Sequence, residues 1–364
     1  MQTLELLAKT IGFITIFKIL ISLIRWVWIA FLRPSKNLKE YGSWALVTGS
    51  TDGIGKALAF ELASKGLHLI LAGRNPTKLK VTTKELLQRY HGSGLQVRSV
   101  VIDFSTDPIE VIDNKIQEGI DGLDVGILIN NAGITNRWPR FFHEADSIVD
   151  DIIRVNVEGM CRVTKAVLPV MLKKKRGAIV NIGSGSADIP SCPLFSTYSA
   201  TKAFIHNFSR GLNLECKQHG IHVQCQIPSY VTTKILAVPL SSFFIPTPEV
   251  YSKSCLRWIG YEPLCIPYWR HSLQGTIVDA LPEALMNWMT LQYVMHLRRM
   301  ENFKGDSQMV DKPPSNGLEL NQELGMAQIA FRRVTSVFLG PWYKFGQSSG
   351  PVSKQAGAYF WKWV

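Results

Sequence analysis

Short apolar runs alternate with longer amphipathic segments from residue 44 to residue 227, and this alternation constrains the fold more than any other feature. The β-rich apolar runs lie at 44–48, 67–72, 96–102, 125–129, 178–182 and 222–227. The helical segments between them lie near 54–65, 76–90, 108–118, 145–173 and 197–218. Buried strands separated by helices predict a parallel sheet covered on both faces. We therefore expect an α/β protein with a doubly wound parallel sheet that binds ligands beyond the carboxyl ends of its strands.

An apolar segment at residues 10–32 precedes this pattern. A helix of this length reaches about 35 Å at ~1.5 Å per residue, enough for a bilayer core of ~30 Å. Its polar residues share one helical face, at Thr15, Lys18, Ser22 and Arg25. We expect a helix that spans the membrane. The alternatives are a helix that lies in the membrane interface and a helix buried in a soluble fold.

The distribution of charge fits a membrane segment better than a nucleic-acid-binding surface. The chain holds 40 Lys and Arg against 28 Asp and Glu, a net charge of +12. Residues 1–40 carry +4 of that excess, and no long basic stripe follows. Arg33, Lys36 and Lys39 follow the apolar segment, whereas Lys9 alone precedes it. The positive-inside bias therefore places the rest of the chain in the cytosol.

The six cysteines form no CxxC pair and have no accompanying histidine cluster. A zinc site is therefore disfavoured, and we expect no metal. A chain of 364 residues does not need disulfides to stabilise its core. We expect reduced thiols, in keeping with a domain that faces the cytosol.

A glycine-rich turn at 48–55 (TGSTDGIG) connects the first strand to the first helix after it. Gly49, Gly53 and Gly55 let the backbone turn tightly and approach a pyrophosphate. The N-terminus of the following helix offers free N–H groups and a partial positive charge. Its position between a strand and a helix makes this turn a candidate dinucleotide site.

Arg74 follows the second strand, where the adenosine ribose is bound in folds of this kind. A carboxylate there favours NAD, whereas a cation suits the 2′-phosphate of NADP. Arg74, with Lys78 nearby, therefore predicts NADPH, and an exposed arginine at a strand end is the alternative. Asp103 ends the third strand, where it either accepts a hydrogen bond from the adenine amino group or caps the strand.

Small residues follow the fourth strand at 130–133 (NNAG). Ala132 leaves room for the cofactor ribose, and amides such as that of Asn130 can tie neighbouring strands together. Asn156 lies within the helical segment 145–173. Asparagine is a middling helix former, so its position there points either to a functional role or to an exposed surface.

Tyr198 and Lys202 stand four residues apart and so share one helical face. A free tyrosine has a pKa of about 10, too high for proton exchange at neutral pH. Because an ammonium stabilises the phenolate, we expect Lys202 to lower the pKa of Tyr198. Ser184, just beyond the fifth strand, would hold a carbonyl oxygen against the Tyr198 hydroxyl.

These motifs together resemble the short-chain dehydrogenase/reductase family over residues 40–235. The resemblance implies that Tyr198 donates the proton and that Lys202 also binds the nicotinamide ribose. Ser184 would orient the substrate, and Asn156 would support a proton-relay water. The family has Pro-Gly where this chain has Pro228-Ser229. The implied cofactor contacts are Gly49, Thr51, Asp52, Gly53, Ile54, Gly55, Arg74, Lys78, Asp103, Asn130, Ala132, Tyr198, Lys202, Val231 and Thr233.

A narrower resemblance covers residues 1–303. The apolar N-terminus and the motifs at 183–185, 261–263, 267–269 and 281–283 resemble the membrane-bound very-long-chain 3-oxoacyl-CoA reductases. The plant form is nearest, and the 17β-hydroxysteroid dehydrogenase type 12 group is a close relative. The resemblance implies NADPH-dependent reduction of 3-oxoacyl-CoA to 3-hydroxyacyl-CoA in fatty acid elongation. It also implies a site in the endoplasmic-reticulum membrane, with long-chain acyl-CoA, membrane lipid and other elongase subunits as partners.

Four segments follow from these patterns. We expect a membrane anchor at 1–40, an NADP-binding reductase domain at 41–230 and an apolar segment at 231–303, rich in proline and aromatic residues. The third segment would cover an apolar substrate or contact the membrane, or it would add helices to the edge of the core. Residues 304–364 show no sustained period, and we expect a poorly ordered tail.

Two other functions remain open from the sequence. The same chemistry on a steroid or another lipid ketone would need the same residues and an equally apolar segment. A non-enzymatic subunit would use the fold to hold elongation enzymes, with the polar stripe of the anchor as its docking face.

Overall fold

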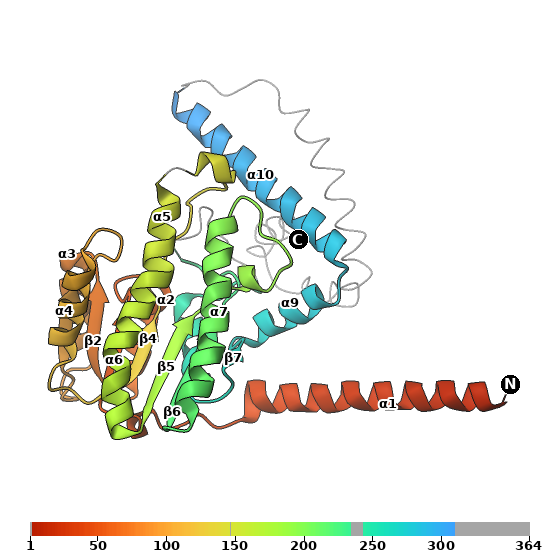
Figure 1. The fold of residues 1–364 in the computed structure, drawn as a ribbon, viewed down its shortest axis with the longest axis horizontal. Coiled ribbons are helices and arrows are strands. Elements are labelled where there is room, and N and C mark those ends of the chain that lie inside the picture. Colours follow the sequence, from red (N-terminus) through yellow and green to blue (C-terminus); the bar gives the residue numbers. More distant parts are fainter. Residues whose placement is uncertain (1, 146, 234–242, 310–364) are drawn as a thin grey trace, which may run out of the picture. The chain divides into compact units, whose positions relative to one another are not determined.

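Seven parallel strands form the central sheet of the computed structural model, which describes residues 2–145, 147–233 and 243–309. Their order is β3-β2-β1-β4-β5-β6-β7 (Figure 1). Every residue of β1, β4 and β5 is buried, because helices cover both faces. The bounds are β1 Trp44–Thr48, β2 His68–Gly73, β3 Val97–Val101, β4 Val125–Asn130, β5 Gly177–Ile182, β6 Ile221–Gln226 and β7 Leu264–Cys265.

The strand order reverses between β1 and β4. β1 pairs with β2 on one side and with β4 on the other. The chain therefore winds outward in both directions from this point, and the carboxyl ends of β1 and β4 border the crevice where such sheets bind ligands. The predicted doubly wound sheet is confirmed.

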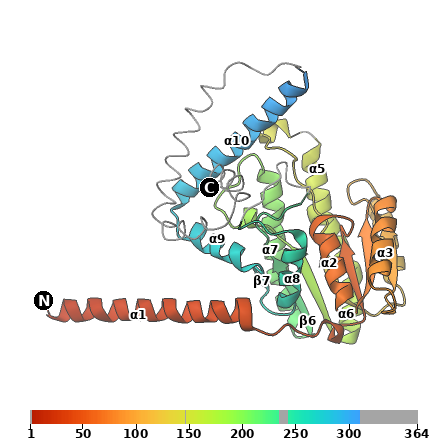
Figure 2. The ribbon, with the colours of Figure 1, turned by 180° about the vertical axis from the view of Figure 1, so that it is seen from behind.

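Helices cover the sheet in two layers, each with its own apolar core. One face is covered by α2 (Gly53–Ser64), α3 (Pro76–Arg89) and α8 (Pro248–Trp258) (Figure 2). The side chains that these helices bury include Leu58, Leu62, Leu79, Leu86, Tyr251 and Leu256. On the other face, α4 (Ile109–Ile120), α6 (Met160–Lys174) and α7 (Ser196–Lys217) pack against the alternate side chains of the same strands. Three short 3-10 helices lie at Leu38–Glu40, Phe142–Glu144 and Gly185–Ala187.

The predicted strands agree with the structure to within one residue at each end. The sequence did not indicate β7, because a strand of two residues shows no periodicity. The long helical segment predicted at 145–173 is divided into α5 (Ile148–Ile153), a π-helical turn (Arg154–Gly159) and α6. Asn156 lies in that π-helical turn, a feature that often occurs at functional sites.

The segment predicted at 231–303 joins the same sheet. β7 pairs with β6, and α8 buries Tyr251, Cys255 and Leu256 against α2. These elements extend the core edge, whereas α9 (Trp269–Asp279) and α10 (Glu283–Met309) keep several apolar side chains exposed.

The chain divides into two compact units, Met1–Arg298 and Arg299–Val364. α10 ends at Met309 and so includes residues 304–309 of the predicted tail. The rest of that tail, residues 310–364, lies outside the described residues.

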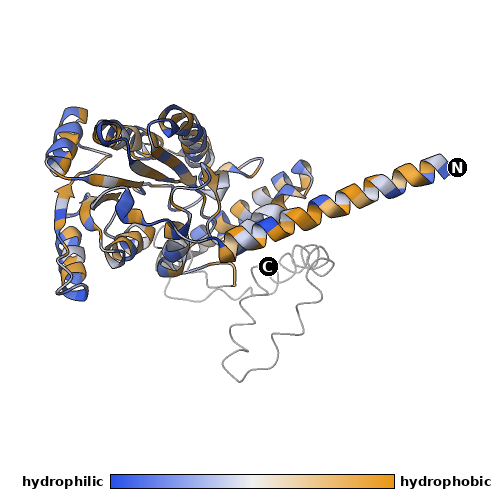
Figure 3. Ribbon diagram, turned by 90° about the horizontal axis from the view of Figure 1, so that it is seen from below, coloured by the Kyte–Doolittle hydropathy of each residue, from blue (hydrophilic) through white to orange (hydrophobic). Residues whose placement is uncertain are grey.

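The N-terminal helix α1 (Gln2–Val27) and the π-helical turn Trp28–Leu32 bury no side chain. Apolar residues cover most of α1 (Figure 3), and residues 2–32 are long and apolar enough to cross a membrane. Within the polar stripe, the Thr15 hydroxyl donates to the Ile11 carbonyl oxygen at 2.8 Å. That hydrogen bond satisfies one polar group inside the helix itself, which suits an apolar surrounding.

Candidate active site

The glycine turn after β1 forms a cradle at the N-terminus of α2. Gly49 and Gly53 have φ of 64° and 50°, the left-handed region that favours glycine. Asp52 caps the helix by accepting from Gly53 N at 3.0 Å. Lys56 N donates the first bond within the helix, to Asp52 O, so the N–H groups of Ile54 and Gly55 point out of the helix end. This arrangement fits a pyrophosphate.

Asn131 ties the turn to β4. Its Nδ2 donates to Thr48 O at 3.1 Å and to Gly49 O at 3.2 Å. A methyl group on Gly55 would lie 2.3 Å from that Nδ2, so only glycine fits there. Thr48 Oγ1 accepts from both Asn131 N and Ala132 N at 3.0 Å. Asn131 was not among the predicted site residues, although the doubled Asn at 130–131 signalled it.

Thr233 lies against the same cradle. A methyl group on Gly53 would come within 3.1 Å of Thr233 Cγ2. Thr233 therefore lies at the turn where we predict its contact with a cofactor. Val231 is 4% exposed and belongs to the apolar core, so its side chain does not face the cradle and only its backbone is left for a contact.

Basic groups stand where the second strand ends. Arg74 is exposed directly after β2. Lys78 Nζ lies 3.7 Å from Asp52 Oδ2, which places Lys78 beside the glycine turn. A methyl group on Gly73 would lie 3.2 Å from Thr51 Cγ2, so the end of β2 and the turn are neighbours. Arg74 and Lys78 thus border the place where an adenosine ribose would follow the pyrophosphate.

Two residues that were predicted to contact the cofactor have side chains that form hydrogen bonds within the protein. Asn130 Nδ2 donates to Thr164 Oγ1 at 2.9 Å and to Asn181 Oδ1 at 2.8 Å, and the residue is 5% exposed. Its side chain ties β4 to β5 and α6 in the interior, as the sequence suggested for these amides, and its contact with the cofactor stays a prediction. Asp103 Oδ1 accepts from Ser105 N and Ser105 Oγ, which is the capping role given above as its alternative.

Ser184 and Tyr198 meet at the carboxyl end of β5. Ser184 forms a side-chain hydrogen bond with Tyr198. Ser186 Oγ donates to Ser184 Oγ at 3.0 Å, and Ser186 N also donates to it at 3.2 Å. These bonds fix the Ser184 hydroxyl next to the Tyr198 hydroxyl, as the sequence predicted.

Lys202 and Asn156 lie on either side of Gly133. A methyl group on Gly133 would lie 3.5 Å from Lys202 Nζ and 3.3 Å from Asn156 Oδ1. Asn156 accepts from Ile134 N at 2.8 Å and donates to Ile134 O at 2.9 Å and Thr201 Oγ1 at 3.0 Å. Asn156 is 1% exposed, which excludes the exposed-surface alternative. The structure therefore brings all four predicted catalytic residues to one place.

The pKa of Tyr198 differs from the expectation. Burial raises it above its usual value of 10.0, and the hydrogen bond with Ser184 opposes that effect. Burial also lowers the pKa of Lys202 to about 8. Lys202 Nζ lies 5.7 Å from the centre of the Tyr198 ring and donates to Ile182 O. Desolvation thus outweighs the attraction that we expected between these two groups.

His271 of α9 forms hydrogen bonds with the backbone after β6. This is the place where the chain has Pro228-Ser229 instead of the Pro-Gly of the family. His271 Nδ1 accepts from Ser229 N at 3.2 Å, so Nε2 carries the proton. Nε2 then donates to Tyr230 O at 3.2 Å and Phe244 O at 3.1 Å. His271 is 1% exposed, and burial lowers its pKa to about 4. No sequence pattern indicated this role of His271, because its hydrogen-bond partners lie far from it along the chain.

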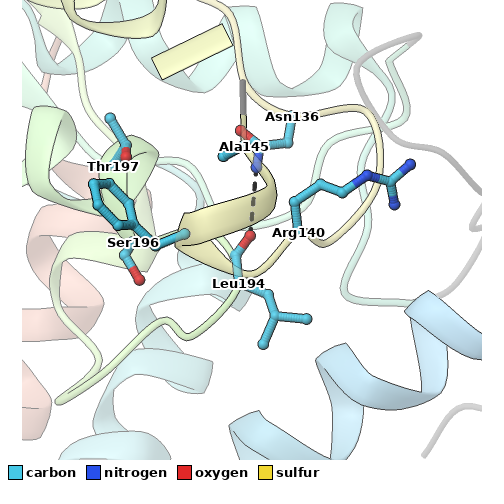
Figure 4. Close-up of a pocket in the computed structure, with 7 residues that line it drawn as sticks. Asn136, Arg140, Ala145, Leu194, Ser196 and Thr197 are labelled. Carbon is cyan, nitrogen blue, oxygen red and sulfur yellow. Dashed lines mark hydrogen bonds between the residues drawn. The ribbon is translucent and has the colours of Figure 1, made fainter. Parts of the chain in front are cut away.

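A small pocket opens beside the start of α7 (Figure 4). Asn136 Nδ2 donates to Leu194 O at 3.4 Å across it. Ser196 and Thr197, which directly precede Tyr198, line the same pocket with Arg140. All six cysteines are free thiols, and in residues 2–145, 147–233 and 243–309 no three His, Cys, Asp or Glu side chains gather to hold a metal.

The fold and this site define a class of oxidoreductase. The short chain dehydrogenase family matches residues 43–239, and the chain belongs to that family. Its members act on carbonyl and hydroxyl groups, in keeping with the Ser184–Tyr198 pair.

Several characterised proteins are similar to most of the chain. A very-long-chain 3-oxoacyl-CoA reductase-like protein of Arabidopsis thaliana is 44% identical, over 80% of this chain and 94% of its own length. The very-long-chain 3-oxoacyl-CoA reductase of Homo sapiens is 36% identical, over 71% of this chain and 80% of its own. The inactive hydroxysteroid dehydrogenase-like protein 1 of Homo sapiens is 40% identical, over 73% of this chain and 81% of its own.

Solved structures share the fold. A short-chain dehydrogenase from Sphingobium yanoikuyae in complex with NADPH is 28% identical, with a TM-score of 0.54 over 66% of this chain and 97% of its own. A 7β-hydroxysteroid dehydrogenase, 24% identical, has a TM-score of 0.62 over 70% of this chain and 99% of its own. A nicotinamide dinucleotide is the cofactor class that the cradle at α2 fits.

Proposed function

We propose that this chain is an NADPH-dependent reductase of very-long-chain 3-oxoacyl-CoA in fatty acid elongation. The observation that carries the proposal is the convergence of four side chains: Ser184 lies against Tyr198, Lys202 lies 5.7 Å from the Tyr198 ring centre, and Lys202 and Asn156 both lie beside Gly133. The names of relatives from Arabidopsis thaliana and Homo sapiens supply the substrate class.

The chemistry follows from the positions of these residues. The Ser184 and Tyr198 hydroxyls, already paired, hold the oxygen of the substrate ketone between them. A nicotinamide cofactor bound at the cradle of α2 would supply the hydride for the ketone carbon. Tyr198 gives its hydroxyl proton to the ketone oxygen, so the products are a 3-hydroxyacyl-CoA and a tyrosinate. The Lys202 ammonium stabilises that tyrosinate, and Asn156 positions the backbone at Ile134 beside it.

The choice of NADPH rests on Arg74 and Lys78. Both cations border the end of β2 next to the glycine turn, where a 2′-phosphate would lie. An arginine binds phosphate oxygens through paired N–H donors, and its charge strengthens those bonds. Asp52, the nearest carboxylate at the turn, is paired with Lys78 and caps α2.

The location follows from α1. A helix of this length with every side chain unburied needs an apolar environment, and residues 1–40 would anchor the enzyme in the endoplasmic-reticulum membrane. Arg33, Lys36 and Lys39 keep the catalytic domain on the cytosolic side. Membrane lipid and other elongase subunits would then be its partners.

An assay of NADPH oxidation by the purified full chain tests the proposal. The wild type should oxidise NADPH with a very-long-chain 3-oxoacyl-CoA, and Tyr198→Phe should lower kcat by about 10²- to 10⁴-fold, the usual contribution of a general acid. NADPH binding by Tyr198→Phe should stay intact. Tyr90→Phe removes a hydroxyl that bonds Phe60 O far from the site and should keep full activity.

The same assay distinguishes two alternatives. Faster turnover of a steroid or other lipid ketone than of the acyl-CoA would assign the site to that substrate. NADPH binding without turnover of any ketone would support a non-enzymatic elongase subunit, a role that the name of the inactive human relative keeps in view.

A further inference from the structure

We propose that α9 and the first turns of α10 rest in the surface of the bilayer that holds α1, as a second membrane contact. This inference depends on the membrane anchor proposed above. The partner is the headgroup and upper acyl region of that bilayer.

The end of α1 packs directly on α9. Trp26 Nε1 donates to Ser272 Oγ at 3.1 Å, and the ring centres of Trp26 and Trp269 lie 6.4 Å apart. Phe31 also stacks near Trp269, with ring centres 5.7 Å apart. α9 therefore begins where the membrane helix ends.

Polar bonds hold this junction in one arrangement. Arg33 pairs with Glu262 at 2.6 Å, and its guanidinium lies 3.8 Å from the centre of the Tyr261 ring. Tyr261 Oη donates to Pro34 O at 2.6 Å, and Arg257 donates to Phe31 O at 3.1 Å. These contacts tie residues 31–34 to α8 and to the segment before β7, whereas Trp26 and Phe31 contact α9 itself. The depth of α1 in the bilayer therefore also sets the depth of α9.

α9 exposes an apolar stripe beside the junction. Leu273 is 39% exposed and Ile277 is 45% exposed, and the spacing of four residues places them on one face. Ser272, which contacts Trp26, adjoins the same face. Residues 271–278 contain no Asp, Glu, Lys or Arg, so no charge opposes insertion there. α10 continues the exposed apolar surface with Trp288 at 52% and Leu291 at 40%.

The residues around this stripe have the chemistry of a membrane interface. Phe243 is 50% exposed, and the Arg270 guanidinium lies 3.7 Å from the centre of its ring. Tryptophan and tyrosine favour the headgroup level, and arginine reaches from apolar surface to phosphates. The aromatic rings Trp26, Phe31, Trp269 and Phe243 meet one another at the end of α1. Phe31 and Phe243 stay 46% and 50% exposed within this cluster, and a bilayer surface would cover that apolar area.

Site-directed labels in the full chain test the inference. Single substitutions Leu273→Cys and Ile277→Cys would carry a fluorophore in protein reconstituted into vesicles of phosphatidylcholine and phosphatidylserine. Lipids with a nitroxide near the headgroup should quench both labels several-fold more than a label at Leu214→Cys, which is 76% exposed on α7. A label at Ile19→Cys, 63% exposed on α1, should be quenched by a nitroxide deep in the acyl chain. Unsubstituted protein gives the background from the native thiols.

The outcomes separate the two proposals. Quenching at Ile19 with no more quenching at Leu273 and Ile277 than at Leu214 would overturn the second contact and leave the anchor. No lipid quenching at any of these positions would overturn both. Labels on α9 that are shielded from aqueous iodide but not quenched by lipid would show that a second copy of the chain covers this face, which would also refute the inference.

Discussion

Lys202 Nζ donates a hydrogen bond to the carbonyl oxygen of Ile182 at 2.9 Å, from a side chain that is only 5% exposed. Ile182 is the last residue of β5, and Ser184 follows two residues later. The same short piece of backbone thus positions the lysine ammonium and the Ser184 hydroxyl, which we propose to bind substrate. This placement buries the Lys202 ammonium, and burial lowers the pKa of Lys202 to about 8.

The first prediction concerns the pH dependence of stability in the cofactor-free protein. Lys202 has a usual pKa of 10.5 and a pKa of about 8 when folded. Between these values the unfolded chain holds a proton that the folded chain has released, so unfolding becomes less favourable as pH rises. The unfolding free energy of the wild type should therefore gain about 3 kcal/mol relative to Lys202→Met from pH 7 to pH 11.

Chemical unfolding in detergent across this pH range measures that difference. Lys165→Met, which removes an exposed lysine from α6, serves as the control and should track the wild type. If the unfolding free energies of the wild type and Lys202→Met changed in parallel with pH, this result would contradict a lowered pKa of Lys202 in the folded protein.

The sequence was sufficient for the sheet, because six apolar runs with helical segments between them allow few other folds. It was also sufficient to indicate which residues lie together at the proposed catalytic site. Tyr198 and Lys202 are four residues apart on one helix, and Ser184 and Asn156 occupy fixed places after β5 and within the π-helical turn. Local spacing encodes all of these positions.

Features that depend on long-range contacts were not predictable. Asn130 and Asn131 are adjacent and chemically identical, yet one faces the interior and the other reaches Gly49. Only the register of β4 against β1 decides which is which. The raised pKa of Tyr198 likewise depends on burial by distant segments, which spacing does not reveal.

Arg74 should decide cofactor preference. Arg74→Ala removes a charged donor from the 2′-phosphate, and hydrogen bonds to charged groups contribute about 1.5–3 kcal/mol. The KM for NADPH should rise about tenfold to a hundredfold, while the KM for NADH stays nearly constant. Steady-state kinetics with both cofactors provide the measurement. Lys80→Ala removes an exposed positive charge from α3, the helix that follows Arg74, and should leave both KM values unchanged. An equal rise in KM for both cofactors would exclude a 2′-phosphate contact by Arg74.

Asn131 should hold the glycine turn ready for the pyrophosphate. Asn131→Ala removes the bonds to Thr48 O and Gly49 O, each worth about 1 kcal/mol. NADPH should bind about tenfold more weakly, because the loosened turn must be ordered on binding. Titration of NADPH fluorescence measures the Kd. Asn114→Ala, at an exposed position on α4, is the matched control, and unchanged affinity in Asn131→Ala would show that the turn holds its shape without this amide.

His271 should make the protein sensitive to acid. The pKa of His271 falls from a usual 6.5 to about 4 through burial, and its neutral ring joins Ser229 N to two carbonyl oxygens. Below pH 6.5 His271 binds a proton in the unfolded chain but stays neutral in the folded chain. Its contribution to the free energy of unfolding is therefore complete above pH 6.5 and is lost as pH falls toward 4. The loss amounts to about 3 kcal/mol.

Thermal unfolding of the wild type and His271→Asn between pH 4 and pH 7 provides the measurement. His271→Asn should be less stable than the wild type at pH 7, because it lacks the imidazole that joins Ser229 N to two carbonyl oxygens. The difference in stability between the two proteins should narrow as pH falls. His219→Asn, which alters an exposed histidine after α7, should follow the wild type at every pH. A gap between wild type and His271→Asn that stays constant with pH would mean that His271 is not held neutral by burial, and the backbone after β6 would then need another explanation for its position beside the active site.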